Sequence, residues 1–323
     1  PQVYHLTQQT ISMGVDVLAV RDFVDQTIFH VFDLLPGASR QEDAYQVKHK
    51  QLITDICVNR AGIIDDQYVV FIDSNRDLYM TRIQNGAENR IHKIGTQVTS
   101  VMWSSECNIL VGLHDSSYSI WYCPGQAYTD PSLIALTTFS YDTSEFGKNI
   151  TLVSFDGLTI TFCASGSKFT VTAKIYCILI HKLVAENKWE KALKICRMGK
   201  STLLWDCLAA LSSHRNQLDI SEEAYSSALQ IDKVDYMSFI KDLSESEQMA
   251  ENIVMIDGRV EEAETILLQS KKISEAIQFC MRLHRWSKAL EIAEKYSTDV
   301  KLVLKMRAKY LSAMQKLEND NDF

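Results

Sequence analysis

Two patterns of hydrophobic and polar positions divide the chain, and the change falls near residue 174. Before it, short β-branched or aromatic runs alternate with polar segments rich in Gly, Pro, Asn and Asp, which is typical of strands joined by turns. After it, Lys, Glu, Ala and Leu dominate and turn residues are scarce, which is typical of helices. All four prolines and ten of the twelve glycines precede residue 175. We predict a β domain over residues 1–174 and an α domain over residues 175–323.

The strand-like runs carry a repeat in which an Asp is followed six residues later by an aromatic side chain. The copies are Asp73 with Tyr79, Asp115 with Trp121, and Asp156 with Phe162, and Asp25 begins a looser one. Successive Asp residues of the three closer copies lie 42 and 41 positions apart, which is the length of a four-stranded propeller blade. We predict strands at residues 15–20, 27–32, 68–72, 78–83, 98–103, 109–112, 118–122, 152–155 and 158–162.

The segment 110–122 is the nearest match to the end of a WD40 repeat, although Tyr122 stands where an Asp is usual. About four blades of this length fit into 174 residues, whereas closed propellers usually have more. The chain begins at Pro1 and runs directly into strand-like sequence. We therefore expect a partial WD40-type β-propeller whose upstream blades are missing.

In the second half, a large apolar residue is followed three positions later by alanine. The copies are Val260 with Ala263, Ile273 with Ala276, and Trp286 with Ala289, at intervals of 13, and Trp189 with Ala192 is an earlier one. Residues three apart share one helix face, and a small alanine lets a neighbouring helix approach closely. We predict a TPR-like α-solenoid of short helical hairpins.

Composition excludes several classes of protein. The net charge of −8 argues against binding to a nucleic-acid backbone. The eight cysteines lack the clustered spacing of a disulfide framework, so we expect reduced thiols. The longest apolar run, residues 175–180, is too short to cross a bilayer. We expect no nucleic-acid partner and no direct insertion into a membrane.

The candidate chemical motifs are weak. Residues 199–202, Gly-Lys-Ser-Thr, resemble the end of a phosphate-binding loop, but Lys194 occupies the position of its first glycine and the preceding residues predict a helix. We interpret Gly199 as a helix C-cap and Ser201 as the next N-cap. No Cys or His pair has the spacing of a zinc site, and no Gly-x-Ser-x-Gly turn occurs.

Three further groups of residues have a structural and a functional interpretation. His114 and Asp115 could form a base with its orienting carboxylate, but a turn role in a hairpin is favoured. The acidic pairs, Asp65 with Asp66 and Glu222 with Glu223, predict solvated faces. We predict no catalytic, cofactor-binding or metal-binding residue and no cofactor.

The last helix has an apolar stripe, Val303, Met306, Tyr310, Ala313 and Leu317, beside a basic face, Lys301, Lys305, Lys309 and Lys316. It could dock an acidic partner, although a solenoid helix with one buried face is the simpler interpretation. The aromatic residues Trp205, Tyr225 and Tyr236 could anchor partners if they are exposed.

Overall likeness adds to this interpretation. The segments 15–22 and 32–33, the segments around Trp103 and Trp121, and residues 187–193, Asn-Lys-Trp-Glu-Lys-Ala-Leu, resemble the family of eighty-kilodalton WD40 and TPR-like subunits of intraflagellar transport complex B. Members of that family carry two propellers before the solenoid, of which only part of one is visible here.

The resemblance implies a non-enzymatic scaffold that supports anterograde transport and cilium assembly. Its partners would be other subunits of complex B, with possible self-association, and its location would be the cytoplasm and the cilium, including the axoneme and basal body. The alternatives are a propeller and solenoid scaffold of a vesicle coat or nuclear pore and, in a different class, the substrate-receptor propeller of a ubiquitin ligase.

Overall fold

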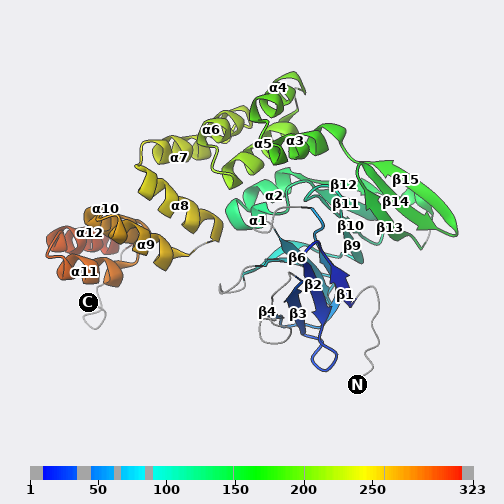
Figure 1. Cartoon of the computed structure of the whole chain (residues 1–323), viewed down its shortest axis with the longest axis horizontal. Coiled ribbons are helices and arrows are strands. Elements are labelled where there is room, and N and C mark those ends of the chain that lie inside the picture. The colour runs from blue at the N-terminus through cyan, green and yellow to red at the C-terminus, as the bar shows by residue number, and fades with distance from the viewer. Residues whose placement is uncertain are drawn as a thin grey trace. The chain divides into compact units, whose positions relative to one another are not determined.

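The computed structural model describes residues 10–34, 45–61, 67–83, 90–147, 149–199, 201–257 and 259–314. Packing divides the chain into two compact units, one that ends at Val234 and one that begins at Asp235. Strands occupy the first half and helices the second (Figure 1).

The strands form four antiparallel sheets in which neighbours in sequence are hydrogen-bonded neighbours (Figure 1). The first sheet is β1 (Ile11–Met13), β2 (Val17–Arg21), β3 (Ile28–Asp33) and β4 (Tyr45–Lys48). The second is β5 (Ile53–Val58), β6 (Tyr68–Asp73), β7 (Leu78–Arg82) and β8 (Ile91–Gly95). The third is β9 (Ser100–Trp103), β10 (Leu110–Leu113), β11 (Ser117–Trp121) and β12 (Thr138–Asp142), and the described part of the fourth is β13 (Thr151–Asp156), β14 (Thr159–Ala164) and β15 (Ser167–Thr172).

Two apolar clusters among the described residues of the β part are each shared by two adjacent sheets. Phe29 of the first sheet and Phe71 of the second lie in one cluster, with ring centroids 5.4 Å apart. Met80 of the second sheet and Trp121 of the third lie in another. A Cβ atom on Gly112 would come within 2.8 Å of the Trp121 ring, so glycine here lets the indole lie flat against β10.

Asp73, one of the recurring Asp residues, lies at the turn between β6 and β7. Its carboxylate Oδ1 accepts hydrogen bonds from the backbone N–H groups of Asn75 and Asp77, both at 2.9 Å. Arg76, in the same turn, has a left-handed backbone with φ of 62°. The carboxylate thus stabilises the β6–β7 turn in the way that Asp commonly does.

Two short helices correct the prediction that the first half contains only strands and turns. They are α1 (Gln126–Thr129) and α2 (Ser132–Leu136), inserted between β11 and β12. Pro131 is the N-cap of α2, and the fixed φ of proline suits the first turn of a helix. A 3-10 turn at Ser144–Phe146 follows β12.

The second half is helical throughout its described length. The helices are α3 (Ile175–Ala185), α4 (Trp189–Gly199), α5 (Thr202–His214), α6 (Leu218–Ser227), α7 (Ile231–Lys241), α8 (Glu245–Asp257), α9 (Val260–Gln269), α10 (Ile273–Arg282), α11 (Trp286–Lys295) and α12 (Val300–Ala313). The predicted repeat of a large residue and an alanine marks the starts of α4, α9, α10 and α11. The four alanines, Ala192, Ala263, Ala276 and Ala289, are all fully buried. The predicted fold class, propeller-type sheets followed by a TPR-like solenoid, is confirmed.

The turns between helices explain the interval of 13. A ten-residue helix is followed by three linking residues, and the middle one has a left-handed backbone, as at Lys271 (φ 59°) and His284 (φ 56°). The N–H of Lys272 donates to the carbonyl of Leu267, and the N–H of Lys271 donates to that of Leu268, both at 3.0 Å. This is a Schellman closure, in which glycine is the usual left-handed residue.

Four other helix ends, those of α3, α5, α6 and α11, repeat this turn with different residues. The left-handed positions there are Asn187, Asn216, Leu229 and Ser297. None of these is glycine, which is why sequence inspection finds few turn signals in this half.

The last strand ends at Thr172 and the first helix of the solenoid begins at Ile175. Compact packing divides the chain later, after Val234, so the domain boundary at residue 174 stays a prediction. Within the described ranges, no helix is both long and apolar enough to span a membrane.

We expect Ala276→Leu to lower the free energy of unfolding by about 1–3 kcal/mol, because the larger side chain overpacks a fully buried site. The matched control is Ala313→Leu, at an exposed position of α12. This substitution should change the free energy of unfolding by less than about 0.5 kcal/mol. Urea unfolding of both variants gives the comparison, and equal losses would contradict a close helix contact at Ala276.

We expect Lys271→Gly to raise the free energy of unfolding by about 1 kcal/mol, because glycine adopts the left-handed backbone without the steric penalty of a Cβ atom. Lys271→Ala removes the same charge but keeps the Cβ atom, so it should bring no such gain. Urea unfolding measures both, and a gain shared by the two variants would show that charge is responsible.

Candidate functional site

The phosphate-loop candidate has the wrong structural context. Gly199 is the last residue of α4, so a helix and not a strand precedes the motif. Ser201 is the N-cap residue of α5, although its side chain makes no capping hydrogen bond, and Lys200 lies outside the described residues. Gly199 has a helical backbone, and a Cβ atom there would lie 2.4 Å from Leu204. Gly199 therefore lies at the C-terminal end of α4, as the C-cap interpretation expects, but it lacks the left-handed backbone that glycine often adopts there.

The structure separates His114 from Asp115. The ring of His114 lies 3.0 Å from the carbonyl oxygen of Gln97 through Nδ1 and 2.8 Å from the hydroxyl of Ser119 through Nε2. Asp115 instead accepts two hydrogen bonds from Arg76, both at 3.0 Å, on an exposed surface. These contacts join neighbouring hairpins, which supports the structural interpretation.

The remaining polar candidates also have structural contacts. Glu223 accepts two hydrogen bonds from Arg197, at 2.8 and 2.7 Å, and Asp65 and Asp66 lie outside the described residues. All eight cysteines are free thiols, and burial raises the pKa of Cys107 to about 11 and that of Cys280 to about 12. Thiols with such pKa values are protonated at neutral pH and are weak nucleophiles. In the parts of the chain that the structure describes, no three His, Cys, Asp or Glu side chains gather as metal ligands would.

The proposed anchor residues are mostly covered. Tyr225 is 2% exposed, and its hydroxyl lies 3.4 Å from a carboxylate oxygen of Asp130. Trp205 and Tyr236 are half-buried. The structure thus favours a core role for Tyr225.

The last helix buries a different face from the predicted stripe. Val303 is fully buried, but Arg307 is buried beside it, whereas Met306 is 40% exposed. The long side chain of arginine can pack its aliphatic part against apolar neighbours, which moves the buried face toward Arg307. Ala313 is exposed, and Leu317 and Lys316 lie outside the described residues. Of the predicted basic face, Lys301, Lys305 and Lys309 are exposed.

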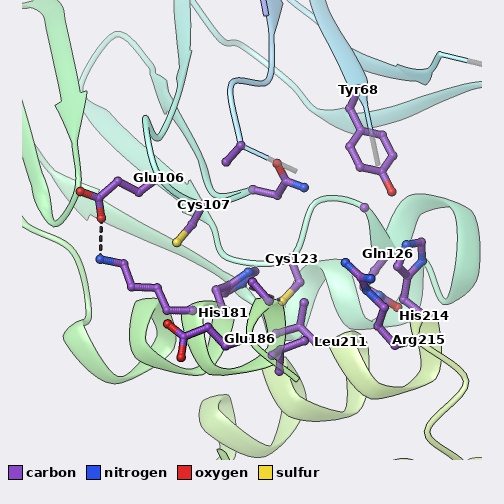
Figure 2. Close-up of a pocket in the computed structure, with 16 residues that line it drawn as sticks. Tyr68, Glu106, Cys107, Cys123, Gln126, His181, Glu186, Leu211, His214 and Arg215 are labelled. Carbon is purple, nitrogen blue, oxygen red and sulfur yellow. Dashed lines mark hydrogen bonds and ion pairs between the residues drawn. The ribbon is translucent and has the colours of Figure 1, made fainter. Parts of the chain in front are cut away.

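A pocket of about 360 Å³ lies where the sheets meet the first solenoid helices, all within the unit that ends at Val234 (Figure 2). Its walls come from the loop with Cys107, from α1 with Gln126, from α3 with His181, and from α5 with Leu211. Figure 2 shows these side chains arranged along the pocket between Glu106 at one end and His214 at the other.

Buried neutral groups form the middle of the pocket. Cys123 Sγ lies 3.7 Å from His181 Nε2, and the two residues are only 4% and 9% exposed. Burial lowers the pKa of His181 from 6.5 to about 4, so the imidazole is neutral at pH 7. His181 therefore contributes no charge to the pocket at pH 7.

One end of the pocket is closed by an ion pair. Lys182 Nζ lies 2.5 Å from a carboxylate oxygen of Glu106, and both side chains are about half exposed. The hydrogen bond from the lysine to Glu106 raises the pKa of Lys182. These two charges compensate each other, and Glu186, which also lines the pocket, pairs with Lys188.

The comparisons with known proteins agree with the fold. The model of the IFT80 second beta-propeller matches residues 1–176, and that of the IFT80/172/WDR35/WDR19 TPR domain matches residues 204–323. Intraflagellar transport protein 80 homologs of Mus musculus and Rattus norvegicus are each 37% identical over 320 residues, or 98% of this chain. The chain belongs to the IFT80 family. It spans 41% of the length of each of these two relatives.

Solved structures add little to this assignment. Hsv2p of Kluyveromyces lactis is similar over 51% of this chain and 55% of its own, at 13% identity and a TM-score of 0.36.

Sequence inspection did not find the pocket residues of this IFT80 family chain. Gln126, Cys123 and His181 come from segments far apart in sequence and form no motif. A buried histidine within a helix gives no signal that distinguishes a pocket wall from a core.

We expect His181 to lower the free energy of unfolding as the pH is lowered. Folding lowers the pKa of His181, so its contribution to the free energy of unfolding is fully present above pH 6.5. This contribution is lost as the pH falls toward 4, because the unfolded chain binds the proton first. The lowering from 6.5 to about 4 corresponds to about 3 kcal/mol.

The measurement is urea unfolding from pH 7 to pH 4 for the natural chain and for His181→Gln, with His284→Gln as an exposed control. Burial raises the pKa of Asp206 to about 6 and acts in the opposite direction, so the informative quantity is the difference between variants. Parallel pH profiles for the natural chain and His181→Gln would refute this role.

Proposed function

We propose that this chain is part of a non-enzymatic scaffold subunit of intraflagellar transport complex B, which supports anterograde transport and cilium assembly through protein–protein contacts. The observation that carries the proposal is the 37% identity to intraflagellar transport protein 80 homologs over 98% of the chain. The partners would be other complex B subunits, with self-association as a further possibility. The protein would act in the cytoplasm and the cilium, including the axoneme and basal body.

The architecture suits this role. A propeller offers rigid faces and a solenoid offers an extended surface, so one chain can hold several partners. The side chains that could suggest catalysis, His114, Asp115 and Glu223, make structural contacts instead. We keep residues 1–174 and 175–323 as two proposed domains of this scaffold.

The described surface also exposes apolar side chains that could contact partners. Leu302 and Met306 lie four residues apart on α12 and are 38% and 40% exposed. Side chains at this spacing share one helix face. Lys301 and Lys305 have the same spacing on a different face and are exposed.

The test is purification of the whole protein from ciliated cells, with crosslinking and mass spectrometry to map contacts onto these residues. We expect complex B subunits, crosslinked to the solenoid helices. Recovery of coatomer, nuclear-pore or ubiquitin-ligase subunits in their place would overturn the proposal.

A paired variant tests the α12 surface in the same experiment. Leu302→Glu with Met306→Glu should reduce recovery of a contacting subunit, because charge is introduced into an apolar contact. Lys301→Glu with Lys305→Glu introduces the same residues on the neighbouring face and should reduce recovery less. Equal recovery with both pairs would exclude this face as a contact.

A further inference from the structure

The fourth sheet lacks a strand that the other three sheets have. Among the described residues it consists of β13, β14 and β15 in that order, whereas each of the other sheets has four strands. β15 forms one edge of this sheet, and β14 is its hydrogen-bonded neighbour (Figure 1). The chain then leaves the sheet and enters α3. The described chain therefore supplies no strand to the free edge of β15.

Contacts with the preceding sheets show which strand is absent. The first strands of successive sheets contact one another, β5 with β1 and β9 with β5, and β13 contacts β9. The N–H of Val58 on β5 donates to the hydroxyl of Ser12 on β1 at 2.9 Å. Similarly, the N–H of Gly157, directly after β13, donates to the hydroxyl of Ser105, just after β9, at 3.2 Å. Although Asp156 aligns β13 with second strands by sequence, β13 lies in the place of a first strand and β15 in that of a third.

The hydrogen bonds between β14 and β15 show which backbone groups of β15 point outward. The N–H of Ala173 donates to the carbonyl oxygen of Leu158 at 2.9 Å, and the pairing continues to the hairpin turn without a shift. In an antiparallel pair, every second residue bonds to its opposite residue, and the residues between them point their N–H and C=O groups to the other side. The outward residues are Lys168, Thr170 and Thr172, all of which are exposed.

Another extended backbone is the ligand that this row of groups fits. Outward N–H and C=O groups recur at every second residue, about 7 Å apart, and an added strand presents its own groups at the same spacing. The third strands β3, β7 and β11 use the corresponding edge to bind β4, β8 and β12. The three complete sheets therefore indicate that the free edge of β15 binds a strand.

The residues of β15 suit pairing at this edge. The stretch from Phe169 to Thr172 consists of aromatic and β-branched residues, which favour strands. Edges that avoid pairing usually carry charges, prolines or bulges, and this stretch has none of them. The one charged residue of β15, Lys168, lies near the hairpin turn. The ring of Phe169 stacks on that of Phe146, with centroids 5.3 Å apart, which holds the strand in place.

We propose that the free edge of β15 binds an extended segment of a partner protein, which completes the fourth sheet as its fourth strand. The backbone N–H and C=O groups of Lys168, Thr170 and Thr172 hold this segment. The choice of a partner protein rests on the proposed scaffold function. A second copy of this chain and another segment of the same protein are the alternative occupants that the test distinguishes.

The first test uses a peptide and requires no other subunit. The probe is a capped peptide with the sequence of residues 136–142, which contains β12, the fourth strand of the third sheet. One isomer has N-methyl groups at the positions of Thr138 and Ser140, and a second has them at Phe139 and Tyr141, so each blocks one edge of the peptide. Ligand-observed NMR with the full chain gives the affinities. We expect one isomer to bind at least about tenfold more weakly than the other, because it loses two hydrogen bonds.

Variants of the chain locate the binding edge. Thr170→Pro removes an outward N–H that the pairing with β14 does not use, and proline is tolerated at such edge positions. We expect it to weaken binding of the unmethylated peptide at least about tenfold, because the ring also obstructs the edge. Thr170→Val keeps the N–H at similar size and should bind within about twofold of the natural chain. The comparison of methylated isomers uses the natural chain, so it does not depend on the folding of Thr170→Pro.

Several results would overturn the proposal. They are absence of peptide binding up to about 1 mM, which is a weak affinity even for one short segment, equal binding of the two isomers, and equal binding by Thr170→Pro and Thr170→Val. Hydrogen exchange at the N–H groups of Thr170 and Thr172 should be fast in the whole protein alone. Slow exchange there would show that a segment of the same protein completes the sheet. Self-association that Thr170→Pro abolishes would show that a second copy does.

The last measurement concerns the partner and separates this proposal from the scaffold function. In the whole protein purified from ciliated cells, Lys168 should crosslink to a partner subunit in the Thr170→Val variant and not in Thr170→Pro. Recovery of complex B subunits with the same Lys168 crosslinks in both variants would overturn the proposal for β15 and leave the scaffold function standing. Failure to recover complex B subunits with either variant would instead contradict the scaffold function, on which the choice of a partner rests.

Discussion

No repeat unit of this chain can bury its apolar surface alone, and the structure depends on the stacking that this imposes. One core is shared by the first and second sheets, the next by the second and third. In the second unit, a single cluster runs from Ala250 on α8 to Val303 on α12. Stability in such a chain comes from interfaces between neighbours. A sheet or helix surface that no neighbouring repeat covers stays exposed, so another protein can bind there. Such surfaces are the physical basis of a scaffold.

The sequence predicts the parts of this stacking that repeat. The pairs of Asp and aromatic residue recur once per sheet, and the buried alanines recur once per helix in α9, α10 and α11. Their spacings therefore correspond to the length of a blade and to that of a helix with its turn. Ala263, Ala276 and Ala289 are fully buried, as expected of positions where a neighbouring helix approaches closely. The fold class could be predicted from these positions alone.

Features that occur once could not be predicted in this way. The turns after α9 and α10 use Lys271 and His284 in a left-handed backbone, which neither residue type signals. On α12, the apolar stripe predicted that Met306 would be buried, but Arg307 is buried and Met306 is exposed. In both cases tertiary packing overrides the local preference of the residue. Helices α1 and α2 were not predicted, because their four and five residues are too few to show a helical period.

The pocket is unpredictable from sequence for a related reason, and it shows how the two halves are joined. The Gln126 amide of α1 bonds to the backbone of α5, the hydroxyl of Tyr122 accepts the N–H of Lys174, and Lys182 of α3 pairs with Glu106. These contacts tie the third sheet to α3 and α5, so the change from strands to helices is not a break in packing. Glu106, Gln126 and Lys182, whose side chains make two of these three contacts, also line the pocket, so it lies against the sheet side and the helix side of the junction together.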